Sequence, residues 1–186
     1  MVTREAVLAE GTPGGFASVY AIYKAMEDSG RVRRGYFVEG LGAAQFALPG
    51  AVDRLRAVRD PEDGGHAVLL AATDPANPYG AALPWPRRSD TDRRSLQRAA
   101  GAYVVMVDGV ATLYLERGGR GLAVLTDDEH AIATALPLLQ GLLGDGHMKA
   151  LTIERIDGEP AHESPLAGWL AEAGFVRSYK GLVFRA

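Results

Sequence analysis

Apolar residues recur at helical spacing between Phe16 and Ser29, where Phe16, Val19, Tyr20, Tyr23 and Met26 form one stripe. This period predicts an amphipathic helix. Gly30 stands where a left-handed C-terminal cap would end it. Upstream, Thr3 can cap a shorter helix over residues 4–9, and a run of Gly and Pro at residues 11–15 separates the two helices.

The pattern changes after Gly30. Residues 31–38 contain the strand formers Val32, Tyr36, Phe37 and Val38, and residues 45–48 can return as a second strand. Pro49 fits the first turn of a further helix that reaches about residue 58. The order helix, helix, hairpin is typical of a winged helix, which we predict over residues 1–60.

Beyond residue 60 the pattern predicts strands that alternate with fewer helices. The acidic, glycine-containing run at residues 60–65 is the predicted linker. Asp108-Gly109 is a strong signal for a two-residue hairpin, Asp127 to Glu129 place acids at the start of a helix, and Pro137 should split that helix. The predicted strands cover residues 67–72, 102–107, 110–116, 121–125, 149–156 and 176–184; the predicted helices or turns cover residues 95–100, 126–143 and 164–174.

These elements define an α+β fold class: a winged-helix module over residues 1–60, then a β-barrel-like antiparallel sheet domain with packed helices over residues 61–186. We expect the strand at residues 67–72 to be buried and the last strand to close the sheet.

The composition limits which classes of protein this chain can belong to. Hydrophobic residues make up 47% and charged residues 23%, as in globular proteins. The sequence has neither an apolar run of the roughly 18 residues that a membrane span needs nor a secretory signal. The absence of cysteine excludes disulfides and thiolate zinc sites, and fits a reducing cytoplasm.

The net charge of -3 is unevenly distributed along the chain. Residues 84–120 hold seven arginines and four acids, whereas residues 121–186 hold five basic and nine acidic residues. We therefore expect any phosphate-binding surface in the first two thirds of the chain. Only three of the 20 basic residues are lysines, which a GC-rich genome also explains.

The sequence lacks the motifs of several kinds of enzyme and cofactor site. There is no P-loop for ATP and no G-x-S-x-G nucleophile elbow. The run Gly40-Leu41-Gly42-Ala43-Ala44-Gln45 lacks the last glycine of a dinucleotide fingerprint. The four histidines have no ligand spacing, so we expect neither a cofactor nor a metal in this chain.

The first candidate site is basic and aromatic. Arg31, Arg33 and Arg34 can contact phosphates, Tyr36 can stack on a base or sugar, and Lys24 can add a contact from the helix. The alternative is that the arginines are solvated and the tyrosine is part of the core. Three nearby acids oppose DNA contact: Glu27, Asp28 and Glu39.

A second basic group surrounds the rigid turn Pro84-Trp85-Pro86. It contains Arg87 and Arg88, with Arg93 and Arg94 a few residues on. Trp85 can wedge against a base or pack over the end of a sheet, and packing is the favoured interpretation.

Asp74 is the candidate catalytic residue. It follows a predicted buried strand and precedes two prolines, which restrict its loop, so a fixed carboxylate could activate water or stabilise an oxocarbenium-like sugar during base excision. The alternative is structural, because Asp before Pro commonly starts a turn by accepting backbone hydrogen bonds.

In sequence, the chain resembles the Lhr (large helicase-related) family over nearly its whole length. The matching segments, in chain order, are Gly14-Gly15-Phe16 with its helix, GRVRRGYFVEG at residues 30–40, GAAQFA at residues 42–47, DPANPYG at residues 74–80 and IDGEP at residues 156–160.

The resemblance implies a DNA helicase that translocates 3′ to 5′, is driven by ATP and Mg²⁺, and takes part in DNA repair. The chain lacks the motor motifs, so we expect the C-terminal, DNA-binding part of such a helicase, with DNA and the motor domains of the same polypeptide as partners. The family is also associated with uracil-DNA glycosylase activity, to which Asp74 could contribute. A third hypothesis is a scaffold whose acidic C-terminal third docks onto the motor or another protein.

Overall fold

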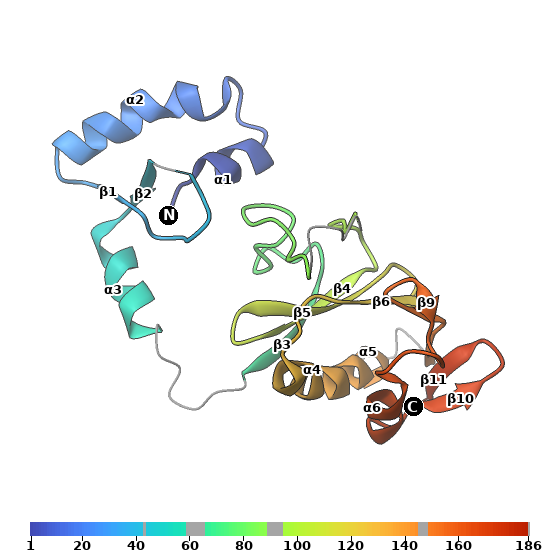
Figure 1. Ribbon diagram of the computed structural model, residues 1–186. Helices are drawn as coiled ribbons and strands as arrows, with labels where there is room; N and C mark the ends of the chain where they lie inside the picture. The colour runs from blue at the N-terminus through green and yellow to red at the C-terminus, as the bar shows by residue number, and fades with distance from the viewer. Residues whose placement is uncertain (43, 59–65, 89–94, 145–148, 186) are drawn as a thin grey trace. The chain divides into compact units, whose positions relative to one another are not determined.

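The computed structural model of the protein describes residues 1–42, 44–58, 66–88, 95–144 and 149–185. The chain divides into two compact units. Unit 1 comprises Met1–Glu62 and Pro78–Pro84, and unit 2 comprises Asp63–Asn77 and Trp85–Ala186 (Figure 1). The predicted linker lies outside the described residues, so the domain boundary at residue 60 stays a prediction.

Unit 1 has the element order expected of a winged helix. Its elements are α1 (Arg4–Ala9), α2 (Gly15–Asp28), β1 (Arg33–Gly35), β2 (Gln45–Ala47) and α3 (Pro49–Ala57). Thr3 caps α1 by accepting a hydrogen bond from the Ala6 amide, and Gly30 has the left-handed φ of 72° that ends α2. Both caps were predicted from the sequence.

Phe46 is the centre of the unit 1 core. Its side chain is 1% exposed, and three aromatic rings of the α2 stripe surround it, with centroids at 6.5 Å (Phe16), 6.0 Å (Tyr20) and 5.3 Å (Tyr23). Burying a side chain of this size contributes about 1.5–3 kcal/mol. The predicted stripe is therefore what fixes α2 against the hairpin.

The wing strands form a short antiparallel sheet. Arg33 pairs with Ala47, Arg34 with Phe46 and Gly35 with Gln45. Val2 adds a bridge on the other edge of β2, since its amide and carbonyl both bond Phe46. The N-terminal residues thereby join the sheet, which the sequence pattern did not predict.

Unit 2 contains a six-stranded sheet with the order β3-β4-β5-β6-β8-β9. The Asp108-Gly109 turn joins β4 to β5 with left-handed φ values of 50° and 81°, as the hairpin signal predicted. Neighbouring strands are antiparallel except β6 and β8, which are parallel. The strands are β3 (Ala67–Ala71), β4 (Tyr103–Val107), β5 (Val110–Leu115), β6 (Gly121–Val124), β8 (Arg155–Ile156) and β9 (Glu159–Pro160).

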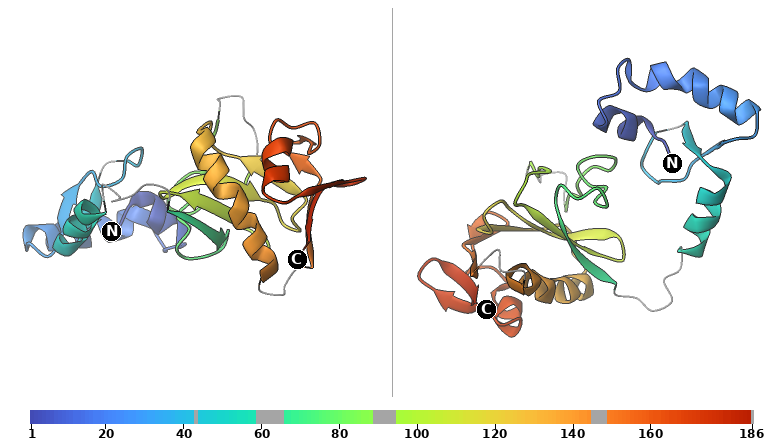
Figure 2. Two further views of the ribbon diagram at one scale, coloured as in Figure 1. Left: turned by 90° about the horizontal axis from the view of Figure 1, so that it is seen from below. Right: turned by 180° about the vertical axis from the view of Figure 1, so that it is seen from behind.

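Helices cover one face of this sheet (Figure 2). The helical segments are α4 (Glu129–Ala135), the 3₁₀ turn η1 (Leu136–Gln140), α5 (Gly141–Gly144) and α6 (Ala167–Glu172). Pro137 falls where α4 gives way to η1, as predicted. Leu113, Leu139 and Leu170 are fully buried between the helices and the strands and belong to one continuous core.

The last strands do not close that sheet, contrary to expectation. The hairpin β10 (Val176–Ser178) and β11 (Gly181–Arg185) pairs instead with β7 (Ala150–Ile153), in a separate three-stranded sheet. Among the described strands no closed barrel is found, so the expected barrel-like architecture is not confirmed. Unit 2 has a mixed α/β structure with antiparallel sheets.

Smaller differences have local causes. β3 is an edge strand with Val68 42% exposed, rather than the buried strand we expected. Residues 95–100 form no helix. Of the acids predicted at the helix start, Asp128 is the N-cap of α4, accepting from the amides of His130 and Ala131, and Glu129 lies in the first turn.

Candidate nucleic-acid interface

The wing separates its arginines into two environments. Side chains alternate across a strand, so Arg34 shares the face of β1 that Phe46 and α2 cover, while Arg33 lies on the opposite face. The Arg34 Nε lies 3.2 Å from Glu27 Oε1, and its Nη1 donates to the Tyr20 hydroxyl at 3.4 Å. Arg34 therefore binds α2 and neutralises one of the acids that opposed DNA contact.

Three other predicted contact residues are exposed. Lys24, Arg31 and Arg33 all lie on the surface, and within the described chain none of the three makes an ion pair. Tyr36, which directly follows β1, is 80% exposed and so does not belong to the core. The wing and the neighbouring helix thus present cations and an aromatic ring to solvent.

The opposite face of α2 is nearly uncharged. Ser18, Ala21, Ile22 and Ala25 are exposed along it, and Ile22 is 59% exposed. Small side chains let another backbone approach closely. This face and the wing residues belong to the same unit and are joined by only a few residues after Gly30.

A buried glutamine organises the wing loop, and sequence reasoning missed its role. Gln45 is fully buried. Its Oε1 accepts from the amides of Phe37 and Val38, both at 2.9 Å. Its Nε2 donates to the carbonyls of Val38, Leu41 and Gly42 at 3.0–3.3 Å. The signal available in the sequence was a polar residue that starts the apolar strand Gln45-Phe46-Ala47.

Gly35 packs closely against the Phe37 ring in the wing. A Cβ at this residue would lie 3.2 Å from the Phe37 ring, which is tighter than ordinary contact. Among the described residues of the loop, Gly40 with φ of 74° and Ala44 with φ of 68° adopt left-handed conformations.

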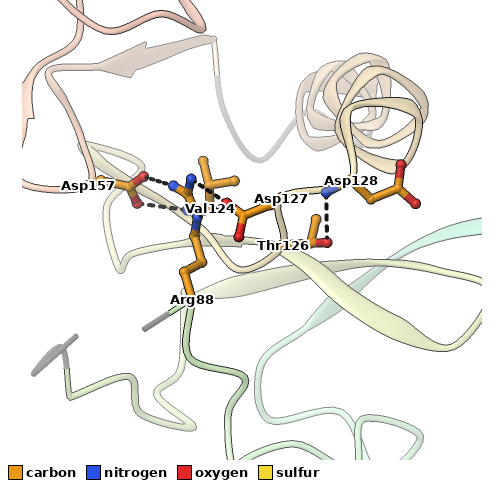
Figure 3. Close-up of polar contacts among 6 residues, drawn as sticks. All are labelled: Arg88, Val124, Thr126, Asp127, Asp128 and Asp157. Atoms are coloured by element: carbon orange, nitrogen blue, oxygen red, sulfur yellow. Dashed lines mark hydrogen bonds and ion pairs between the residues drawn. The ribbon is translucent and has the colours of Figure 1, made fainter. Parts of the chain in front are cut away.

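In the second predicted basic group, Arg88 mainly joins loops of unit 2. Arg88 Nε donates to Asp127 Oδ1 at 2.8 Å, and its Nη1 lies 3.2 Å from Asp157 Oδ2 (Figure 3). Asp157 also accepts the Val124 amide at 2.9 Å. The guanidinium therefore links three loops of unit 2. The sequence analysis placed Asp127 at the start of a helix but predicted neither Asp127 nor Asp157 as a partner of Arg88, although Asp157-Gly158 is a turn signal.

Trp85 packs edge-on against Tyr114, with ring centroids 5.2 Å apart and an interplanar angle of 74°. This is the packing role that we favoured. Tyr114 in turn donates its hydroxyl to the Gln97 carbonyl at 2.8 Å. Arg87 is exposed beside them, and Arg93 and Arg94 lie outside the described residues.

Asp74 forms a turn. Its Oδ1 accepts the Ala76 amide at 2.8 Å, and its own carbonyl accepts the Asn77 amide at 2.9 Å. Such a side-chain bond two residues on is the Asx turn that Asp before Pro favours. The carboxylate is partly exposed rather than enclosed.

Two residues that the sequence did not flag hold this loop. The buried Asn77 donates to the Ala72 carbonyl at 2.9 Å. The Arg98 guanidinium donates to the carbonyls of Thr73 (3.3 Å), Asp74 (3.2 Å) and Asn77. The loop is therefore held in place by three carbonyl groups, of residues 73, 74 and 77, that converge on one cation.

Neither a metal centre nor a membrane span emerges from the described residues. No group of His, Asp or Glu side chains there could hold a metal ion. No helix found in those residues combines the length and apolarity of a membrane span. A cleft of about 470 Å³ beside Arg88, Asp127 and Trp169 has a mixed polar and apolar wall.

The helix, helix, wing order and the aromatic packing of α2 on the hairpin define unit 1 as a winged-helix domain. Residues 1–67 match the family model described as large helicase-related protein, winged-helix domain. The chain belongs to the Lhr, or large helicase-related, family, as its sequence motifs predicted.

Two curated relatives match the chain over nearly its full length. One is the "Lhr helicase/ probable uracil glycosylase" of Mycolicibacterium smegmatis, 46% identical over 196 aligned residues that cover 100% of this chain. The other is the "Lhr helicase/uracil glycosylase" of Escherichia coli strain K12, 40% identical over 187 residues that cover 98% of it. The chain spans only 13% and 12% of the lengths of these two proteins.

Proposed function

We propose that this chain is a DNA-binding module from the C-terminal region of an ATP-dependent, 3′-to-5′ Lhr-type helicase that works in DNA repair. The observation that carries the proposal is the exposure of Arg31, Arg33 and Tyr36, which together are called the outer wing, whereas Arg34 binds Glu27 on α2. Family membership and the winged-helix fold support it.

The physical basis is the charge of the phosphate backbone. Each phosphate that an arginine neutralises releases condensed counterions, so binding weakens as salt increases. Charge-assisted bonds from guanidinium groups fix the module on the strand. Tyr36 can stack on a base or sugar beside them, and Lys24 on α2 can add a contact.

The second basic group contributes less in this account. Arg88 is held by two carboxylates and Trp85 packs on Tyr114, so of the group's arginines that the structure describes, Arg87 is the one that presents its charge to solvent without an ion pair. The ATP and Mg²⁺ that drive translocation would bind the motor domains, which we propose as partners within the same polypeptide.

The test compares variants of neighbouring arginines. Arg33→Glu should weaken binding of labelled forked DNA by at least tenfold at low salt, measured by fluorescence anisotropy, because it places an acid among phosphates. Arg34→Gln is the matched control: it should change affinity less than threefold, because Arg34 already binds Glu27. Equal effects of the two variants, or none, would contradict the assignment of the outer wing.

A second candidate function, uracil excision, is favoured by the names of both relatives, which include uracil glycosylase. In this proposal Asp74 would assist hydrolysis of an N-glycosidic bond in a flipped uracil nucleotide. The Asx turn at Asp74 argues instead for a structural role of that residue.

Asp74→Asn separates the two roles, because asparagine keeps the oxygen that accepts the Ala76 amide but cannot act as a carboxylate base. We expect abasic-site formation on uracil-containing DNA to be the same in wild type and in Asp74→Asn. A loss of at least 100-fold in this variant, with unchanged thermal unfolding, would restore Asp74 as a catalytic residue.

A further inference from the structure

The β10–β11 hairpin carries the most exposed of the large hydrophobic side chains that the structure describes. Tyr179, in the turn of the hairpin, is 93% exposed, and Val176 on β10 is 64% exposed. The Lys180 Nζ lies 5.4 Å from the centroid of the Tyr179 ring. In the views of Figures 1 and 2 the hairpin lies at the periphery of unit 2, beside α6, which contacts β11.

The charge of this segment is opposite to that of its surroundings. Residues 175–186 contain Arg177, Lys180 and Arg185 and no acid, within a C-terminal third that is acidic as a whole. Glu154 follows the paired strand β7, but it forms an ion pair with Arg120 at 3.6 Å. A local net charge of +3 therefore accompanies the exposed ring.

The fold holds the turn close to the sheet. Gly181 has φ of 146°, and a Cβ there would lie 2.9 Å from the Glu154 Cα and would also collide with the Ile153 carbonyl. Leu182, the next residue, pairs with Ile153 and is 1% exposed. The base of the hairpin is thus anchored in the core, while the two residues before Gly181 are presented to solvent.

We propose that the tip of this hairpin is a second nucleic-acid contact that binds unpaired DNA, with Tyr179 stacking on a base and Lys180 and Arg177 contacting the adjacent phosphates. Every base has a π-face, so such a contact tolerates any sequence, and stacking on an aromatic side chain combined with cations is how single strands are held. The exposed apolar surface here is one valine and one ring, which favours a nucleic acid over a protein groove.

This inference extends the proposed function to another surface, and it does not require the wing to bind DNA. It departs from the charge argument from the sequence, which placed any phosphate-binding surface in the first two thirds of the chain. Averaging over residues 121–186 concealed a short basic segment at the end.

The experiment uses the 186-residue chain with labelled oligothymidine and with a labelled blunt duplex, titrated by anisotropy. Tyr179→Ala should weaken oligothymidine binding roughly tenfold, and Tyr179→Phe should keep it within about twofold, because the ring and not the hydroxyl stacks. Lys180→Gln should lower the slope of log K against log salt by about 0.7 on the single strand.

Lys149→Gln is the matched control. It removes the same charge from an exposed lysine beside the same sheet, but next to Ala150, which pairs with Arg185 at the end far from the turn. It should leave oligothymidine binding unchanged. Equal losses in Lys149→Gln and Lys180→Gln would overturn the proposal, and so would an unchanged affinity in Tyr179→Ala.

The outcomes distinguish this inference from the proposed function. Duplex binding lost in Arg33→Glu, together with unaltered single-strand binding in Tyr179→Ala, would overturn the hairpin contact and keep the wing. The reverse pattern would overturn the wing and keep the hairpin. Binding of neither DNA at low salt would overturn both.

Discussion

Tyr114 is the residue whose ionisation the fold changes most clearly. Burial, with a smaller contribution from Glu116, raises the pKa of its hydroxyl above the usual 10.0. The neutral hydroxyl donates to the Gln97 carbonyl and its ring contacts Trp85. An acid whose pKa is raised by folding contributes stability that is complete below its unfolded pKa and is lost as the pH rises through its folded pKa.

We therefore predict that Tyr114→Phe is less stable than wild type by about 1 kcal/mol at pH 8, the net worth of one hydrogen bond. Above pH 10 the unfolded wild type ionises before the folded protein, so the difference between the two proteins should shrink. Urea unfolding from pH 8 to pH 11 measures it. A difference that stays constant over this range would contradict the account.

Other single residues show why roles were harder to predict than elements. Arg33 and Arg34 are neighbours with the same chemistry, and their roles were not distinguished in the prediction from sequence. The pairing of Arg34 with Phe46 decides that Arg34 lies against α2 and meets Glu27. A strand register is a contact between distant segments, so the arginine that is free to bind phosphate could be identified only from the folded structure.

The wing is an element whose shape depends on one side chain. In the loop between β1 and β2, the Gln45 side chain forms hydrogen bonds with two amides and three carbonyls. These bonds take the place of hydrogen bonds between paired strands. These groups would otherwise be unsatisfied near the core, and each such loss costs about 1–3 kcal/mol.

We predict that Gln45→Met, which keeps the volume but removes the amide, destabilises unit 1 by about 3 kcal/mol. The amides of Phe37 and Val38 should lose their protection against hydrogen exchange, and those of β4 and β5 in unit 2 should keep theirs. Protection unchanged at Phe37 and Val38 would show that the loop does not depend on this amide.

At the level of elements, local signals predicted more than long-range pairing did. Thr3, Gly30, Pro49 and Pro137 mark helix ends by backbone chemistry that acts within a few residues, and the structure has helix boundaries near each. The barrel-like closure was not confirmed because it depended on which strand the last strand pairs with. β11 pairs with β7, and β8 pairs with β6 in parallel. No turn signal in the sequence predicts these long-range pairings.

At the scale of the whole molecule, two units carry different candidate surfaces. Unit 1 presents the outer wing, and unit 2 presents the β10–β11 hairpin; the second basic group of unit 2 is largely used to join loops. A net charge of -3 is compatible with DNA binding because the cations are gathered on these surfaces. The module would bind the DNA, and ATP-driven translocation would come from motor domains, whose motifs this chain lacks.

The measurement that tests the central claim most directly is the salt dependence of duplex DNA binding by wild type and by the double variant Arg31→Gln, Arg33→Gln. If the outer wing contacts phosphates, wild-type affinity falls steeply with salt, and the double variant loses about 1.8 from the slope of log K against log salt, roughly 0.9 for each phosphate contact. A slope that is the same in both proteins would contradict the claim that this wing holds DNA.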